Sequence, residues 1–194
     1  IDRKRFIIKI CCIGRKGPIG EKIEGLGYKV DELCKNPFSL GPDVTYTLVR
    51  YLKKEKPDIL HCSLFNANFH GRLAAFLCRV PHVITEEHGE HRQYIGIKFF
   101  PYIFADFVLS RLNDFIICCS DRLREDIIKK ERLARSKAVT IENRLDLDMY
   151  KIDKNRLEVR KKYNISNEAV FIEAASLKEG KGHAYLIEVL REIK

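Results

Sequence analysis

Few of the residues that mark unusual protein classes occur in this sequence. With 6 prolines and 11 glycines in 194 residues, the chain is neither collagen-like nor of low complexity. No apolar run approaches the roughly 18 residues that a membrane-spanning helix needs. Apolar residues make up 45% and charged residues 32%, a mixture typical of a soluble globular protein with room for one domain and part of a second.

Three signatures of well-known sites are also missing. The sequence has no CxxC pair, no GxGxxG after a predicted strand, and no GxxxxGK followed by serine or threonine. Dinucleotide and P-loop sites therefore lose their main sequence support. The 7 cysteines fall in apolar runs such as Cys11-Cys12 and Cys118-Cys119, and we interpret them as reduced core residues of a cytoplasmic protein.

The net charge is strongly positive, with 36 lysines and arginines against 27 acidic residues, or +9. Such a charge favours an anionic partner, which can be nucleic acid, a membrane surface or a phosphorylated substrate. The basic clusters at 3–5, 122–137 and 151–162 are mixed with acidic residues, as on solvated helix faces. Because no helix-turn-helix, RRM or zinc pattern is present, no nucleic-acid partner is expected.

Short apolar runs alternate with amphipathic helical patterns along the chain. Strands are predicted at residues 6–12, 28–33, 58–62, 82–86, 114–119, 138–142 and 169–175. Helices are predicted at residues 18–26, 44–52, 69–77, 99–112, 121–133, 156–163 and from about 181 onward. Repeated strand–helix–strand units need right-handed crossovers, which give a mostly parallel sheet covered on both faces.

The sequence therefore predicts an α/β protein with a doubly wound, Rossmann-like sheet. Residues 1–147 are expected to form this domain, and the charged stretch 148–167 a connector. The last predicted strand and helix, within 168–194, look like the start of a second domain of the same kind.

Polar residues follow most of the predicted strands. Ligands of open parallel sheets bind beyond the carboxyl ends of the strands, so these residues are the site candidates. The candidates are Gly14, Arg15, Lys16, His61, Ser63, Glu87, His88, Gly89, Ser120, Asn143, Ser176, Lys181 and Gly182.

Residues 86–91 hold the densest group of titratable side chains. His88 and His91 are three residues apart, which suggests a metal site, but Gly89 indicates a turn and no cysteine lies nearby, so no metal is expected. A histidine at a strand end beside an acid suits general acid–base chemistry or a hydrogen bond to a substrate hydroxyl. The alternative is a histidine that only orders its loop.

A second candidate lies at residues 179–183, between a predicted strand and a helix. Lys181, with a glycine on each side, can hold a diphosphate together with the exposed N–H groups of the helix. A plain turn with a solvated lysine is the other interpretation.

Six segments, in this order and spacing, resemble the glycosyltransferase family 4 group of retaining sugar transferases with the GT-B fold. The segments are 56–65, 71–75, 80–89, 114–120, 141–146 and 176–183, and they extend over nearly the whole chain. The resemblance implies transfer of a sugar from a UDP- or GDP-sugar to a polysaccharide or lipid-linked acceptor, with retention and without a metal or covalently bound cofactor. The chain would hold the acceptor-side domain and the beginning of the donor-binding domain.

The resemblance also implies roles for individual residues. His88 would be the catalytic residue near the transferred sugar, and Lys181 would contact the donor diphosphate, whose growing negative charge a fixed cation stabilises. The acceptor-side cleft would contain His61, Glu87, Gly89 and Ser120. Gly182 and Asn143 would join Lys181 in donor binding.

Two positions depart from the family pattern. Arg144 replaces a turn glycine and would be strained if its φ were positive, and Ser176 stands where a donor-side arginine is common. The family's first strand would precede Ile1 and its acidic donor motif would follow Lys194, so the 194 residues are not expected to catalyse transfer by themselves. The departures also support an alternative, a non-catalytic Rossmann-like binding module.

The aromatic stretch 99–104, next to basic residues, bears on localisation. It would suit peripheral contact of a cytoplasmic protein with the inner face of a membrane. A helix face packed into the core is the alternative.

Overall fold

The structure is a computed structural model that describes residues 2–33, 41–89, 104, 107–150, 155–177 and 180–193. It divides into two compact units, Ile1–Arg144 and Leu145–Lys194. Each unit is described by itself.

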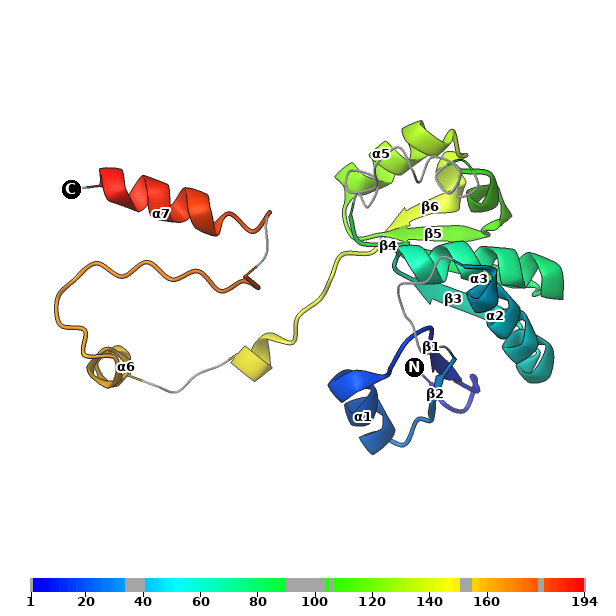
Figure 1. Ribbon diagram of the computed structural model, residues 1–194, viewed down its shortest axis with the longest axis horizontal. Coiled ribbons are helices and arrows are strands. Elements are labelled where there is room, and N and C mark those ends of the chain that lie inside the picture. The colour runs from blue at the N-terminus through cyan, green and yellow to red at the C-terminus, as the bar shows by residue number, and fades with distance from the viewer. Residues whose placement is uncertain are drawn as a thin grey trace. The chain divides into compact units, whose positions relative to one another are not determined.

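The first unit alternates strands and helices, as predicted (Figure 1). Its strands are β1 (Ile10–Cys12), β2 (Val30–Glu32), β3 (Ile59–Ser63), β4 (His82–Glu87), β5 (Phe115–Cys118) and β6 (Ala138–Thr140). Its helices are α1 (Gly17–Gly25), α2 (Pro42–Glu55), α3 (Phe65–Cys78) and α5 (Asp121–Glu131), with short 3-10 turns η3 (Ser110–Leu112) and η4 (Arg135–Lys137). The α/β class is confirmed.

All strand pairs are parallel, but they form two sheets rather than one. One sheet has the order β1-β2 and the other the order β3-β4-β5-β6. In the described residues no backbone hydrogen bond joins β1 to β3, so each of these strands is an edge. Helix α2 links the sheets through side chains, because the Tyr51 hydroxyl donates to Asp31 Oδ2 at 3.0 Å and Leu52 packs near Leu60.

The four-stranded sheet carries its described helices on one face. Since its strands follow one another in chain order, right-handed crossovers place all connecting helices on the same side. Cys62 faces Gly71 of α3, and Ile116 packs against Leu123 of α5. On the opposite face Ile59 is 47% exposed. The expected cover on both faces is therefore seen on one face only in the described ranges.

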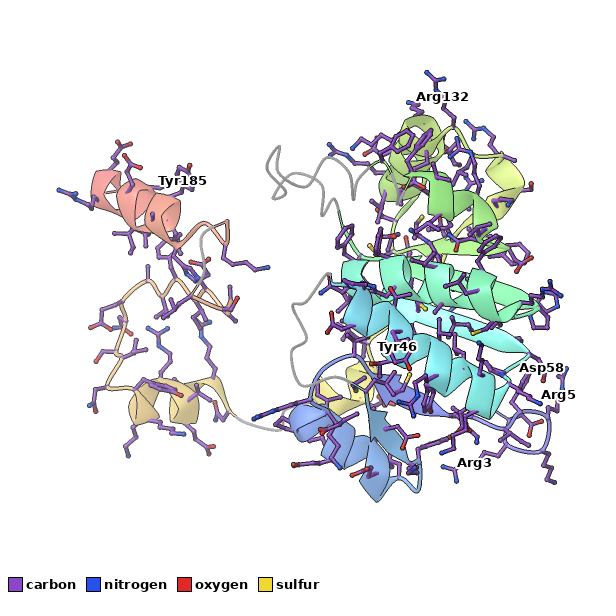
Figure 2. The ribbon with its side chains drawn as sticks, turned by 45° about the vertical axis from the view of Figure 1, so that its right-hand side comes forward. Arg3, Arg5, Tyr46, Asp58, Arg132 and Tyr185 are labelled. Atoms are coloured by element: carbon purple, nitrogen blue, oxygen red, sulfur yellow. The ribbon has the colours of Figure 1, made fainter. Side chains whose placement is uncertain are left out.

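Two small apolar clusters hold these layers together. The first joins Leu48 and Leu52 of α2 to Ala74 of α3, in line with the predicted apolar face of the helix over 44–52. The second joins Ile116 and Cys118 of β5 to α5. Figure 2 labels Asp58, which lies just before β3.

The second unit consists of η5 (Leu147–Tyr150), α6 (Arg156–Lys162) and α7 (His183–Glu192). The two helices confirm the helical predictions, but the predicted strand over 169–175 does not form. Phe171 and Ile172 are 60% and 86% exposed, and no described strand of this unit offers a partner for their backbone groups. A strand is held by its neighbour, so apolar residues alone do not create one.

Half of the predicted helix over 99–112 falls outside the described residues; 104 and 107–109 are helical, and the 3-10 turn η3 follows them. The aromatic segment 99–104 is outside them as well, except for Phe104. None of the helices in the described ranges is both long and apolar enough to cross a membrane.

Candidate active site

The carboxyl ends of β3 and β4 bring polar residues from two parts of the sequence together. The parallel register sets Ser63 opposite Glu86 and His61 opposite Ile84. His88 follows β4 directly. The convergence predicted for the ends of these strands is present in the structure.

Glu86 forms the centre of a group on the sheet face away from the helices. Its Oε1 lies 3.4 Å from His88 Nε2, and its Oε2 lies 3.7 Å from His61 Nε2. Ser63 Oγ is 3.3 Å from the same His88 Nε2. We call His61, Ser63, Glu86 and His88 the Glu86 cluster.

The next residue, Glu87, faces the other way, because successive side chains of a strand alternate between the two faces. Its Oε1 accepts a hydrogen bond from Asn68 Nδ2 at 2.9 Å and lies 3.4 Å from an Arg72 nitrogen. The resemblance placed Glu87 in the acceptor-side cleft, whereas here its carboxylate lies against helix α3.

Arg72 is the buried partner that holds this end of β4. It is 1% exposed and donates to Thr85 Oγ1 at 3.1 Å and to Asn113 Oδ1 at 3.2 Å, besides its contact with Glu87. A buried charge is tolerated when it is paired and its donors are satisfied. The network therefore fixes the backbone from which His88 emerges.

Strand β5 supports the same backbone from the other side. The Cys119 amide donates to the carbonyl of Glu87 at 3.3 Å, and Cys119 Sγ lies 3.6 Å from the carbonyl of His88. Ser120, another predicted cleft residue, is the N-cap of α5, and its side chain accepts a hydrogen bond from the Leu123 amide at 3.3 Å.

Gly89, also predicted in the cleft, follows His88. An added Cβ at Gly89 would meet no atom within 4 Å, so no described neighbour requires glycine there.

Asn143 lies three residues beyond β6 and is exposed. The neighbouring Arg144 is not among the residues with positive φ, so the strain expected for this replacement of a glycine does not arise.

The remaining donor-side candidates belong to the second unit. Gly182 has φ +85° and is the N-cap of α7, which is a conformation that favours glycine. Lys181 directly precedes it, so one cation stands at a helix end whose first N–H groups have no partner within the helix. His183 Nε2 lies 3.0 Å from the Ser176 carbonyl, and this hydrogen bond, with Glu173 nearby, raises the pKa of His183.

Sequence reasoning included Glu86 in the titratable group at 86–91 without giving it a role, and it did not single out Arg72 as a site residue. Glu86 and His88 are two residues apart, so in an extended strand their side chains lie on the same face. This spacing could have indicated Glu86, rather than Glu87, as the acidic partner of His88. Arg72 stands among small and apolar residues of a helix, where its burial could be suspected but its partners could not.

No group of three or more His, Cys, Asp or Glu side chains in the described ranges is arranged to hold a metal ion. The arrangement of the Glu86 cluster can exchange protons or hydrogen-bond a hydroxyl, with Nε2 of both imidazoles turned toward one carboxylate.

Comparison with known proteins gives a consistent result. The profile of Glycosyltransferase Family 4 matches residues 4–149. The Escherichia coli UDP-Gal:alpha-D-GlcNAc-diphosphoundecaprenol alpha-1,3-galactosyltransferase is 27% identical over 202 residues, an alignment that takes in 100% of this chain and 51% of that protein. The chain thus spans about half the length of the curated relative that it matches.

Solved structures with similar folds include a glycosyltransferase from Rickettsia africae, with a TM-score of 0.67 and 19% identity over 95% of this chain and 48% of that one. Anabaena HepE, solved with UDP and glucose, has a TM-score of 0.71 and 17% identity over 91% of this chain and 48% of its own. At these identities the likeness supports the fold, a Rossmann-like domain as in GT-B glycosyltransferases. Since the family profile takes in more than half of the chain, the protein belongs to Glycosyltransferase Family 4.

Proposed function

We propose that the chain is the acceptor-side part of a retaining glycosyltransferase that moves a sugar from a UDP- or GDP-sugar to a polysaccharide or lipid-linked acceptor. The observation that carries the proposal is the Glu86 cluster, which sets His88 at the carboxyl edge of the sheet in a chain of this family. The E. coli relative is named for transfer from UDP-Gal to a diphosphoundecaprenol-linked sugar, which supports a nucleotide-sugar donor and a lipid-linked acceptor.

In this proposal His88 hydrogen-bonds the reacting sugar or acceptor, with His61, Gly89 and Ser120 near the acceptor and Glu87 fixing the end of β4. Lys181 and Gly182 at the start of α7, together with Asn143, bind the donor diphosphate. The fixed cation and the helix N–H groups stabilise the charge that the leaving diphosphate gains. No metal and no bound cofactor take part, and nucleic acid is not a partner.

The 194 residues by themselves are proposed to be inactive, because the donor-side unit has no buried residue in its described helices. The test measures turnover of UDP- and GDP-sugars with a lipid-linked acceptor, both by the chain alone and by the product of its complete reading frame. We expect turnover by the complete product only. In that product, His88→Ala should abolish turnover and Lys181→Ala should raise the donor KM. Turnover by the chain alone would overturn the inactivity, and absence of turnover in both, with donor binding retained, would favour the non-catalytic binding module.

The protein is also proposed to be cytoplasmic and to touch the inner face of a membrane. Phe104 and Val108 are 60% and 48% exposed, and the Arg111 guanidinium lies 4.0 Å from the Phe107 ring centroid, so apolar and basic groups share one segment. Apolar and cationic side chains together suit an anionic lipid surface. Co-sedimentation with anionic vesicles at low and high salt tests this, and absence of binding at low salt would exclude it.

A further inference from the structure

Glu86 lies within 4 Å of two imidazoles. Both His61 and His88 present Nε2 to it, one to each carboxylate oxygen. In the described residues no lysine or arginine lies within ion-pair distance of Glu86, so the two imidazoles are the basic side chains next to it.

The surroundings of the carboxylate can be followed element by element. Strand β3 contributes His61 and Ser63, and strand β5 contributes Ile117, which is paired with Glu86 in the register. The other carboxylate at this strand end, Glu87, is turned toward Arg72 on the opposite face. Glu86 is thus the acidic group that faces His88.

The chemistry of these groups constrains the histidine ring. An ionised carboxylate only accepts hydrogen bonds, whereas a neutral imidazole has one N–H and one lone pair. A carboxylate beside Nε2 therefore favours the proton on Nε2 and leaves Nδ1 as the acceptor. Ser63 Oγ, also beside Nε2, can donate or accept and does not choose between the tautomers.

We propose that Glu86 is a positioning residue, which holds His88 in the Nε2–H tautomer so that Nδ1 is the ring nitrogen that accepts a hydrogen bond from the sugar or acceptor hydroxyl. His61 Nε2 lies beside the second carboxylate oxygen, at 3.7 Å. The role of Nδ1 rests on the proposed function, whereas the tautomer of His88 does not.

The ring state is tested by nitrogen NMR of the isotopically labelled chain at a pH where its histidines are neutral, with an unstructured histidine peptide as reference. We expect a larger Nε2–H fraction for His88 than in the peptide. Glu86→Gln, whose amide both donates and accepts, should lower this fraction to that of the peptide or below. Glu86→Asp should preserve it.

Two further variants separate the effect of Glu86 on the His88 tautomer from that of Ser63 and from the loss of a surface charge. Ser63→Ala should leave the His88 tautomer unchanged, and Glu21→Gln is the control for loss of one exposed carboxylate on α1. An unchanged tautomer ratio in Glu86→Gln, in a variant that keeps the wild-type backbone spectrum, would overturn the proposal. A change in Ser63→Ala without one in Glu86→Gln would transfer the role to Ser63 and overturn it as well.

Turnover by the complete reading-frame product gives the second readout. Glu86→Gln should lower kcat about 10-fold or more, as expected when a general acid–base group is misaligned, with the donor KM nearly unchanged. An altered tautomer with unchanged kcat would remove the positioning role and leave the proposed function intact. Unchanged turnover in His88→Ala would instead refute the role that the proposed function gives to His88.

Discussion

Arg72 is a full charge in a place that water does not reach. It has 1% of its surface exposed and is surrounded by oxygens from Thr85, Glu87 and Asn113. Removing one member of a buried ionic network leaves the others desolvated and unpaired, which typically costs about 3–5 kcal/mol. The strand end that carries His88 thus depends on a buried side chain of helix α3.

Arg72→Met should accordingly lower the free energy of unfolding by about 3–5 kcal/mol, because Glu87 and Asn113 would lose a buried partner. Urea denaturation followed by circular dichroism measures the change. Arg122→Met, at an exposed position of α5, is the matched control and should change the stability by less than about 0.5 kcal/mol. Equal effects of the two substitutions would contradict the proposed importance of the network.

The thiols differ in environment, and their reactivity should follow. Burial raises the pKa of Cys62 to about 12 and that of Cys118 to about 11. At pH 8 both pKa values lie well above the pH, so each thiolate fraction is about 10⁻³ or less. Iodoacetamide at pH 8 should therefore modify partly exposed Cys119 before Cys62 and Cys118, as followed by peptide mass spectrometry.

In urea at the same pH the three cysteines should react at similar rates, because burial is lost. Rapid modification of Cys62 in the folded protein would show that its side chain is accessible.

At the level of single residues, sequence reasoning found the histidines but not their partners. His61 and His88 follow from their positions at the ends of apolar runs. Strand alternation places Glu86 and Glu87 on opposite faces of the sheet, but it does not say which of them faces the helices. The register with β3 settles this, because Glu86 is paired with Ser63. The partners of Arg72 come from two separate segments, β4 and the residue that follows η3, and no local sequence pattern predicts that these segments come together at Arg72.

Among the elements, α3 and β3 are in unusually close contact. A Cβ built on Gly71 would lie 2.3 Å from Cys62 Sγ and 3.5 Å from Cys62 Cβ. Glycine in the middle of a helix normally costs about 1 kcal/mol relative to alanine. The glycine in α3 is therefore explained by packing, since it lets the helix approach the sheet.

Gly71→Ala should destabilise the protein by about 1–3 kcal/mol despite its better helix propensity, because the site is overpacked. In a Cys62→Ala background the same substitution should be neutral or stabilising. Thermal unfolding of the wild type, the two single variants and the double variant measures the interaction between the two positions. Gly25→Ala, where the added Cβ meets no atom within 4 Å, is the control and should not destabilise. Destabilisation by Gly71→Ala in both backgrounds would refute the assignment of the clash to Cys62.

The elements also show where pattern recognition reaches its limit. The apolar periodicity of 44–52 and the runs at 58–62, 82–86 and 114–119 correspond to α2, β3, β4 and β5 within one to three residues. The run over 169–175 is also apolar, but it forms no strand. An apolar run becomes a strand only when a neighbouring strand pairs with its backbone. The two-sheet arrangement is likewise invisible in the sequence, which specifies strands but not which edges meet.

On the scale of the whole molecule, the buried apolar side chains are concentrated in one unit. The described core residues run from Val30 to Ala138, and neither α6 nor α7 contains a buried residue. Figure 2 shows, for example, Tyr185 projecting from α7, and its side chain belongs to a helix with no core of its own. Helices of this length gain most of their stability from packing, which the second unit lacks in its described residues.

Limited trypsin digestion should therefore cut within residues 155–177 and 180–193 before it cuts within 41–89 and 107–144. Mass spectrometry of the early products identifies the sites. Digestion in urea is the control, in which cuts should be spread over the whole chain. Early cuts within 41–89, at the same rate as those after 145, would contradict a stability difference between the units.

The separation of β1 from β3 has a consequence beyond the description of the sheets. Each strand has one side where backbone donors and acceptors find no partner strand in the described chain. Such sides can recruit extended peptides, whether from another copy of the protein or from a ligand added on purpose. A short extended peptide that pairs with one of these edges would be detected by the backbone amides that it newly protects from hydrogen exchange.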